Sequence, residues 1–215
     1  MYIIILILVL VQNVYEVEKI SSSVLKDKYY VFLHYLEFYI SLFPKSIYQI
    51  FIENNEMEVQ IKKEYVLKFF KMLKDSSWSQ FKVVSDIIAV DYPGKENRFD
   101  IIYQMLSQRY NSRMNVLVDA GELSSSPSIT KLYKGASWYE REVWDLYGVF
   151  FEGHPDLRRI LTDYSFEGHP LRKDFPLTGY FEVFYDDTKK RIVYEPVSLV
   201  QEYRYFTFNN PWLEK

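Results

Sequence analysis

Residues 80–120 read QFKVVSDIIAVDYPGKENRFDIIYQMLSQRYNSRMNVLVDA, a stretch rich in branched and aromatic side chains. Three runs within it, Gln80–Val90, Arg98–Ser107 and Arg113–Ala120, have the composition of β-strands. The turn Asp91-Tyr92-Pro93-Gly94 separates the first two runs, because proline and glycine interrupt a strand pattern. This part of the chain therefore predicts three consecutive strands.

Two helices and a hairpin are predicted before these strands. Ser21–Ser23 can cap a helix over Val24–Phe43, whose apolar residues recur at helical spacing. Ile47–Ile52 and Met57–Ile61 flank a polar turn and predict a hairpin. Lys62–Lys74 predicts a second helix with apolar residues on one face and lysines on the other. The expected fold class is α+β, a mixed β-sheet with helices packed on one face, followed by an extended proline-rich C-terminal tail.

A short helix is predicted where the chain leaves this sheet region. Ser137 and Glu140 have the spacing of a capping box, with serine at the N-cap and glutamate three residues on. The helix should run to about Tyr147, and Gly148 is placed to end it.

The tail beyond this helix is expected to be extended, since five of the eight prolines fall in the last 65 residues. One hairpin is predicted within it, from Phe181–Tyr185 and Arg191–Glu195. Such a tail buries little against itself, so a partner surface is the expected reason for its order. The predicted organisation is an apolar N-terminal segment (1–20), an α+β domain (21–136), and a short helix with a partner-binding tail (137–215).

Composition excludes several functions. The chain has 215 residues, a formal net charge of −3 and no cysteine. The charge argues against nucleic-acid binding, and the lack of cysteine excludes disulfides, thiolate-bound iron–sulfur clusters and a cysteine nucleophile. The motifs GxGxxG, GxxxxGK[ST], GxSxG and HExxH are all absent, so the chain does not look like a stand-alone redox or hydrolytic enzyme. Residues 136–215 carry a net charge of −4, so the acidity lies in the C-terminal part.

Met1–Val11 (MYIIILILVLV) is an unbroken apolar run. It is too short to span a bilayer as a helix, which needs about 20 such residues. It lacks a basic region and a small-residue cleavage site, and no Arg- and Ser-rich transit peptide is present. A signal sequence and an interfacial anchor remain alternatives to the preferred interpretation, a segment buried against the protein or a partner. Without a transit peptide, an organellar location would require synthesis inside the organelle.

A duplicated motif carries the densest polar residues. Phe151–Pro155 (FEGHP) recurs 15 residues later as Phe166–Pro170, and each copy precedes a basic pair. The two Glu/His pairs could bind a metal or transfer protons. The preferred interpretation is turn chemistry, in which glycine bends the chain and histidine bonds a neighbouring loop. The arginines that follow would then clamp carboxylates in this chain or across an interface.

The same region resembles one known family. Glu140–Val149 (EREVWDLYGV), His154–Tyr164 (HPDLRRILTDY) and Gly168–Tyr180 (GHPLRKDFPLTGY) are similar to the 30-kDa-type subunit of respiratory complex I, also called NADH dehydrogenase subunit 9, and to its counterpart in NADH-quinone oxidoreductase. Shorter matches occur at Ala89–Pro93, Arg109–Arg113, Tyr194–Val197 and Tyr203–Phe206, so the resemblance covers roughly residues 80–215. Ser165 departs from the glycine expected there, and residues 1–75 match only in the order of their elements.

The resemblance implies a non-catalytic structural subunit of the peripheral arm of NADH:ubiquinone oxidoreductase. Its expected partners are the 49-kDa-type subunit, which it would brace near the quinone site, the PSST-type subunit and other subunits of the complex. No cofactor is expected in this chain, because FMN and the iron–sulfur clusters belong to partner subunits. The implied location is the matrix side of the mitochondrial inner membrane, reached through the complex.

No catalytic, cofactor-binding or metal-binding residue is expected in this chain, although whether it belongs to an enzyme stays open on the residues alone. Two alternatives are an equivalent scaffold subunit of a membrane-bound hydrogenase and a small metal-dependent enzyme using the two Glu/His pairs. The residues expected at a partner interface or in fixing the tail are Glu140, Arg141, Trp144, Asp145, His154, Asp156, Arg158, Arg159, His169, Arg172, Lys173 and Asp174.

Overall fold

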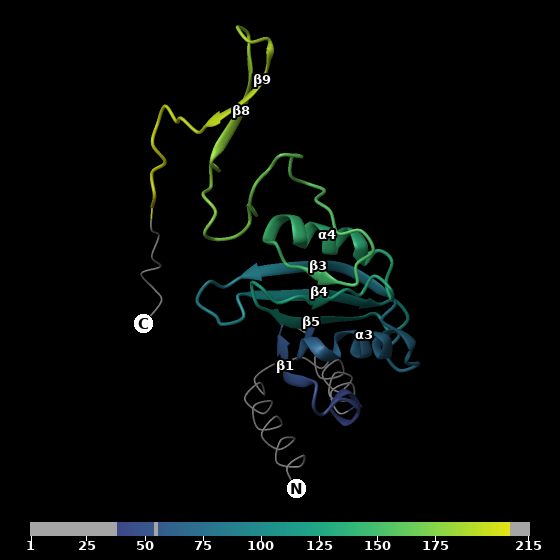
Figure 1. Ribbon diagram of the computed structural model, residues 1–215. Helices are drawn as coiled ribbons and strands as arrows, with labels where there is room; N and C mark the ends of the chain where they lie inside the picture. The colour runs from purple at the N-terminus through teal and green to yellow at the C-terminus, as the bar shows by residue number, and fades with distance from the viewer. Residues whose placement is uncertain (1–37, 54–55, 207–215) are drawn as a thin grey trace. The chain divides into compact units, whose positions relative to one another are not determined.

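A computed structural model describes residues 38–53 and 56–206, which fall into two compact units (Figure 1). The first unit ends at Arg172 and the second begins at Lys173. Within the described ranges no helix is both long and apolar enough to cross a membrane. The apolar run Met1–Val11 lies outside these ranges.

The first unit is built on a five-stranded mixed sheet in the order β1-β2-β5-β4-β3. Strands β2 and β5 are parallel, and the other neighbouring pairs are antiparallel. The strands are β1 (Ile47–Glu53), β2 (Glu56–Ile61), β3 (Val83–Asp91), β4 (Phe99–Ser107) and β5 (Ser112–Ala120). The predicted mixed sheet, with its hairpin and three later strands, is confirmed with small shifts at the strand ends.

One face of this sheet carries the hydrophobic core. Tyr103 of β4 lies opposite Val116 of β5 and Ile87 of β3, and all three side chains are buried. The helices that cover this face are α3 (Val66–Asp75), which follows a 3-10 turn at Lys63–Tyr65, and α4 (Ala136–Tyr147). The Phe70 ring of α3 packs against the Tyr103 ring with centroids 4.9 Å apart. Burial raises the pKa of the Tyr103 hydroxyl, and Glu140 of α4 lies close enough to raise it further. Both helices therefore cover the same face, as predicted.

The first predicted helix, Val24–Phe43, is described only from residue 38 onward. Residues 38–42 are helical, and the Phe43 N–H still donates to the Tyr39 carbonyl at 2.9 Å. Pro44 follows and has no N–H with which to continue the pattern. The predicted end of the helix is confirmed, whereas residues 24–37 lie outside the described part of the chain.

The predicted capping box at the start of α4 is wrong. The helix begins at Ala136 with Gly135 as its N-cap, which makes no side-chain cap bond. Ser137 lies inside the helix, and its hydroxyl contacts His154 Nε2 at 3.2 Å. Glu140 is buried and accepts hydrogen bonds from a different segment. Tertiary contacts thus use both side chains that the local pattern assigned to the helix start. The predicted end is confirmed, because Gly148 is the C-cap with φ +78°.

A short parallel pairing that the sequence does not predict joins the chain before and after α4. The two strands are β6 (Ser126–Pro127) and β7 (Phe151–Glu152). Their hydrogen bonds extend to neighbouring residues, with the Ser128 N–H donating to the Glu152 carbonyl at 2.9 Å. The pairing places the first FEGHP copy beside the segment that contacts Glu140.

The second unit contains the predicted hairpin. Strands β8 (Phe181–Asp186) and β9 (Arg191–Pro196) pair antiparallel around a turn in which Lys190 has φ +50°. The Val197 N–H donates to the Tyr180 carbonyl at 3.1 Å and closes the open end of the hairpin. Most side chains of this unit are exposed, and none of the fully buried apolar residues among those described lies in it.

Candidate functional site

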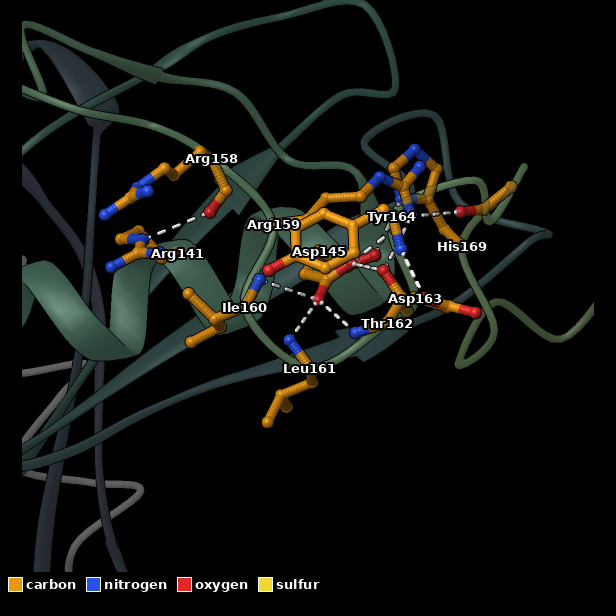
Figure 2. A network of polar contacts seen from close by, with 11 residues as sticks. Arg141, Asp145, Arg158, Arg159, Ile160, Leu161, Thr162, Asp163, Tyr164 and His169 are labelled. Carbon is orange, nitrogen blue, oxygen red and sulfur yellow. Dashed lines mark hydrogen bonds and ion pairs between the residues drawn. The ribbon is translucent and has the colours of Figure 1, made fainter.

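The predicted interface residues of the first unit converge on α4, where Asp145 is the centre of a polar network (Figure 2). Its carboxylate is fully buried. Oδ2 accepts three consecutive backbone N–H groups, from Ile160 at 3.2 Å, Leu161 at 2.7 Å and Thr162 at 2.9 Å. Oδ1 accepts from the Thr162 hydroxyl at 2.6 Å and from Arg159 Nη1 at 3.2 Å. One carboxylate therefore fixes the path of the chain over residues 160–162.

The ionised form of Asp145 is favoured by this geometry. Burial by itself would raise the pKa of the carboxyl group, but the hydrogen bonds from Thr162, Leu161 and Ile160 outweigh it and hold the pKa below its usual value. A negative charge is thus stable inside the protein because five donors surround it.

The arginines of this region donate hydrogen bonds to backbone carbonyl groups as well as to carboxylates. Arg159 Nη1 also donates to the Gly168 carbonyl at 2.9 Å, and Arg141 Nε donates to the Arg158 carbonyl at 3.1 Å. The Arg158 side chain pairs with Asp156 at 2.9 Å, and both groups are well exposed. The predicted use of arginine on carboxylates is thus seen inside this chain.

Each FEGHP copy places its histidine against α4, the first near the start of the helix and the second near its end. His154 Nε2 lies 3.2 Å from the Ser137 hydroxyl, near the helix start. His169 Nδ1 lies 2.9 Å from the Asp145 carbonyl, near the helix end, so Nδ1 carries the proton and donates it. The glycine before each histidine has a positive φ, +80° at Gly153 and +98° at Gly168. This is the arrangement that the turn interpretation predicts.

The environment of His169 favours its neutral form. Burial lowers the pKa of the ring, and the nearby charges of Arg172 and Arg159 lower it further, although the bond to the Asp145 carbonyl acts in the opposite direction. Trp144, which is half-buried, packs edge-on against the His169 ring with centroids 5.8 Å apart. His169 is therefore a packed contact between the second copy and α4, and its surroundings favour the neutral ring.

The chain is held closely where α4 ends. Arg172 Nε donates to the Tyr147 carbonyl at 2.6 Å, and Arg172 Nη1 contacts Glu122 Oε1 at 2.8 Å. A Cβ atom on Gly148 would lie 2.6 Å from both Arg172 Nη2 and His169 Nε2. Glycine is thus required at this position by its positive φ and by close packing.

Glu140 forms a second buried polar contact, on the core side of α4. Its Oε1 accepts the Ile129 N–H at 2.8 Å, and its Oε2 accepts the Ser128 hydroxyl at 2.6 Å. Burial raises the pKa of this carboxyl group to about 7, although the two hydrogen bonds act in the opposite direction. The contact joins α4 to the segment that follows β6.

The structure brings most of the predicted site residues to α4 and leaves three elsewhere. Asp156 pairs with Arg158 on the surface. Lys173 and Asp174 open the second unit and are exposed. The residues that the sequence analysis missed are Thr162, Ser128 and Glu122. Thr162 lies in a stretch that resembles the family, but no local pattern assigns a contact to any of the three residues, because each acts on another segment of the chain. The backbone N–H groups at 160–162 carry no signal in a sequence.

The Glu/His pairs of the duplicated motif do not meet. Nowhere in residues 38–53 and 56–206 do three or more His, Asp or Glu side chains gather as metal ligands would. His154 and His169 lie at opposite ends of α4, so the two Glu/His pairs do not form one common site.

The fold and this network define a class of protein, an α+β fold whose charged residues fix its own loops to α4. A family model described as respiratory-chain NADH dehydrogenase, 30 Kd subunit, matches residues 59–181, more than half of the chain. The chain belongs to this family of complex I subunits, which confirms the resemblance noted in its sequence.

Three similar proteins are named as parts of NADH oxidoreductases. The chain is 53% identical over 173 residues to NADH-ubiquinone oxidoreductase subunit 9 of Reclinomonas americana, covering 80% of this chain and 85% of that protein. It is 54% identical to an NADH-quinone oxidoreductase subunit of Paramagnetospirillum magneticum, covering 73% and 79%. It is 55% identical to the mitochondrial 30.4 kDa subunit of Neurospora crassa, covering 76% of this chain and 58% of that one.

A solved structure is also similar. It belongs to the membrane-bound sulfane sulfur reductase, an archaeal respiratory membrane complex. The TM-score is 0.58 at 25% identity, and the match covers 67% of this chain and 85% of that chain. The same fold is thus found in a second type of respiratory complex.

Proposed function

We propose that this chain is a non-catalytic structural subunit of the peripheral arm of proton-pumping NADH:ubiquinone oxidoreductase. In this role it braces the 49-kDa-type subunit near the quinone site, beside the PSST-type subunit. Electrons pass through cofactors of the neighbours, FMN and iron–sulfur clusters, and not through this chain. The chain contributes to the reaction by holding its partners in position, because a displacement of about 1 Å near reacting groups lowers rates strongly.

The observation that carries this proposal is the apolar face of the β8–β9 hairpin. Its cross-strand pairs on one face are Phe181 with Pro196, Val183 with Tyr194, and Tyr185 with Ile192. All six side chains are exposed within this chain. A two-stranded hairpin is at best marginally stable alone in water, and a contiguous exposed apolar patch marks an interaction surface. A partner that covers this face explains both features.

The proposed location is the matrix side of the mitochondrial inner membrane. The names of the similar proteins support a mitochondrial location, since the relative in Neurospora crassa is described as mitochondrial. The chain would be held at the membrane by its partners.

Native gel electrophoresis of membranes extracted in mild detergent tests the assembly role. The chain should migrate with NADH-oxidising activity in one very large band. Val183→Asp, which places a charge on the apolar face of the hairpin, should reduce the amount in that band by about tenfold or more. Glu182→Gln on the opposite face is the matched control and should assemble normally. A chain found only in a small free pool would contradict the proposal.

The likeness to the sulfane sulfur reductase complex favours one alternative, a scaffold subunit in a different respiratory complex such as a membrane-bound hydrogenase. Activity measurements on the native complex distinguish complex I from this alternative. NADH oxidation that stops with a quinone-site blocker supports complex I, whereas hydrogen production or another donor reaction supports the alternative.

A further inference from the structure

The backbone of the loop that follows the first FEGHP copy is fixed by hydrogen bonds to a buried carboxylate. Asp145 Oδ2 accepts three successive backbone N–H groups, those of Ile160, Leu161 and Thr162. Arg159 lies beneath the same loop, where its Nη1 donates to Asp145 and to the Gly168 carbonyl. The backbone here is therefore fixed from the inside, before any partner binds.

The side chains on the outside of this loop do not contribute to the core. Leu161 is 60% exposed and Tyr164 is fully exposed, at 108%. Figure 2 shows Leu161 pointing away from the Asp145 carboxylate that holds its backbone. Large apolar side chains on a rigid, exposed loop are typical of binding anchors, because little conformational entropy is lost when they bind.

The charged residues around Leu161 and Tyr164 indicate what kind of partner these two side chains contact. Asp163 and Glu167 are exposed on the same loop. Of the two nearby arginines, Arg159 is turned inward to Asp145, and the exposed Arg158 is paired with Asp156 at 2.9 Å. The outer surface is thus apolar with acidic flanks. An anionic lipid surface would repel it, while a protein pocket lined by apolar residues and flanked by lysine or arginine is complementary to it.

We propose that Leu161 and Tyr164 anchor this chain in an apolar pocket of another subunit of the complex, with basic side chains facing Glu167. This inference rests on the proposed assembly role and adds a second contact, in the first unit, to the hairpin of the second. Asp145 acts as a positioning residue, because it accepts the Leu161 and Thr162 N–H groups and so fixes the backbone that leads to Tyr164.

The test is a double variant, Leu161→Asp with Tyr164→Asp, expressed in the native host and followed on the native gel. Its amount in the very large band should fall by about tenfold or more relative to the wild-type chain. Leu123→Asp is the matched control, because Leu123 is also fully exposed, at 101%, but lies in the turn after β5. The control should assemble like the wild type. The thermal midpoint of the purified double variant should equal that of the wild-type chain, which separates a lost contact from a lost fold.

The outcomes distinguish this inference from the proposed function. Normal assembly of the double variant, with the wild-type chain in the large band, overturns the anchor and leaves the assembly role standing. A wild-type chain that never enters the band removes the assembly role and the anchor with it. If the aspartates unfold the chain, Leu161→Asn with Tyr164→Asn replaces them and must give the same loss of assembly.

Two further arms test the chemistry of the partner. Glu167→Lys should lower the assembled amount, and an unchanged amount overturns the basic flank. Purified wild-type chain should not sediment with vesicles of phosphatidylcholine and cardiolipin. Sedimentation that the double variant abolishes would assign the anchors to a lipid surface and overturn the protein pocket.

Discussion

Asp145 is the residue on which the loop over residues 160–162 depends. Asparagine at this position keeps the shape but replaces one acceptor oxygen with an NH2 group, which would face N–H donors. We expect Asp145→Asn to lower the free energy of unfolding by about 2–4 kcal/mol, because buried donors and Arg159 lose their partner. Urea unfolding followed by circular dichroism measures the change.

The control for this prediction is Asp156→Asn. Asp156 pairs with Arg158, but both groups are exposed, so the change should be within about 1 kcal/mol. Equal stability of Asp145→Asn and the wild type would show that the carboxylate does not hold the loop.

The raised pKa of Glu140 leads us to expect that the stability of the protein falls as the pH rises. Burial raises the pKa of its carboxyl group from 4.5 to about 7, so the folded protein binds the proton more tightly than the unfolded chain. This contribution to stability is fully present below pH 4.5 and is lost as the pH rises toward 7. The expected loss is about 3 kcal/mol across this interval.

Glu140→Gln should remove this dependence, because the glutamine stays neutral and its oxygen can still accept the Ile129 N–H. Urea unfolding of the variant and the wild type at several pH values between about 4.5 and 7.5 measures the slope. Glu142→Gln on the exposed side of α4 is the matched control and should keep the wild-type slope. Parallel curves for Glu140→Gln and the wild type would contradict the assignment.

At the scale of the elements, the end of α4 is fixed by both conformation and packing. Gly148 has φ +78°, and a Cβ there would lie 2.6 Å from Arg172 and His169. We expect Gly148→Ala to destabilise the protein by about 1–3 kcal/mol, because the left-handed conformation is strained for alanine and the contacts must shift. Thermal unfolding measures the change.

The start of the same helix supplies the control. Gly135 has φ −62°, and a Cβ there would meet nothing within 4 Å. Gly135→Ala should therefore be neutral or stabilising by up to about 1 kcal/mol. If both variants lowered stability equally, the end of the helix would carry no special constraint.

Periodic elements were predictable from sequence, and elements made by distant contacts were not. The apolar face of α3 is a local pattern, and so is the strand-like composition of β8 and β9 on either side of a polar turn, so these elements lie where expected. The parallel pair β6–β7 joins residues 25 positions apart in the chain and leaves no local pattern. The capping box failed for the same reason, since a buried contact to Ser128 and Ile129 uses the Glu140 carboxylate.

At the scale of the whole molecule, the family could be recognised from residues 140–180, and the family match over residues 59–181 confirms it. The importance of Asp145 and its arginines was also expected. That the donors to Asp145 are mainly backbone N–H groups was not, because the backbone is the same in every sequence. Long motifs thus identify the family, while the structure shows what the charged residues do.

The division into two units leads to a prediction about truncation. The fully buried apolar side chains among the described residues lie between Tyr39 and Phe151, so the core is complete before the hairpin begins. A variant that ends at Tyr180 should keep the thermal midpoint of the full chain within about 4 °C, the shift expected for roughly 1 kcal/mol in a protein of this size. The same variant should be missing from the large native band, because it lacks the apolar face that we propose is covered by a partner. A large fall in the midpoint would instead show that the hairpin segment stabilises the fold itself, and normal assembly would show that the hairpin is not the interface.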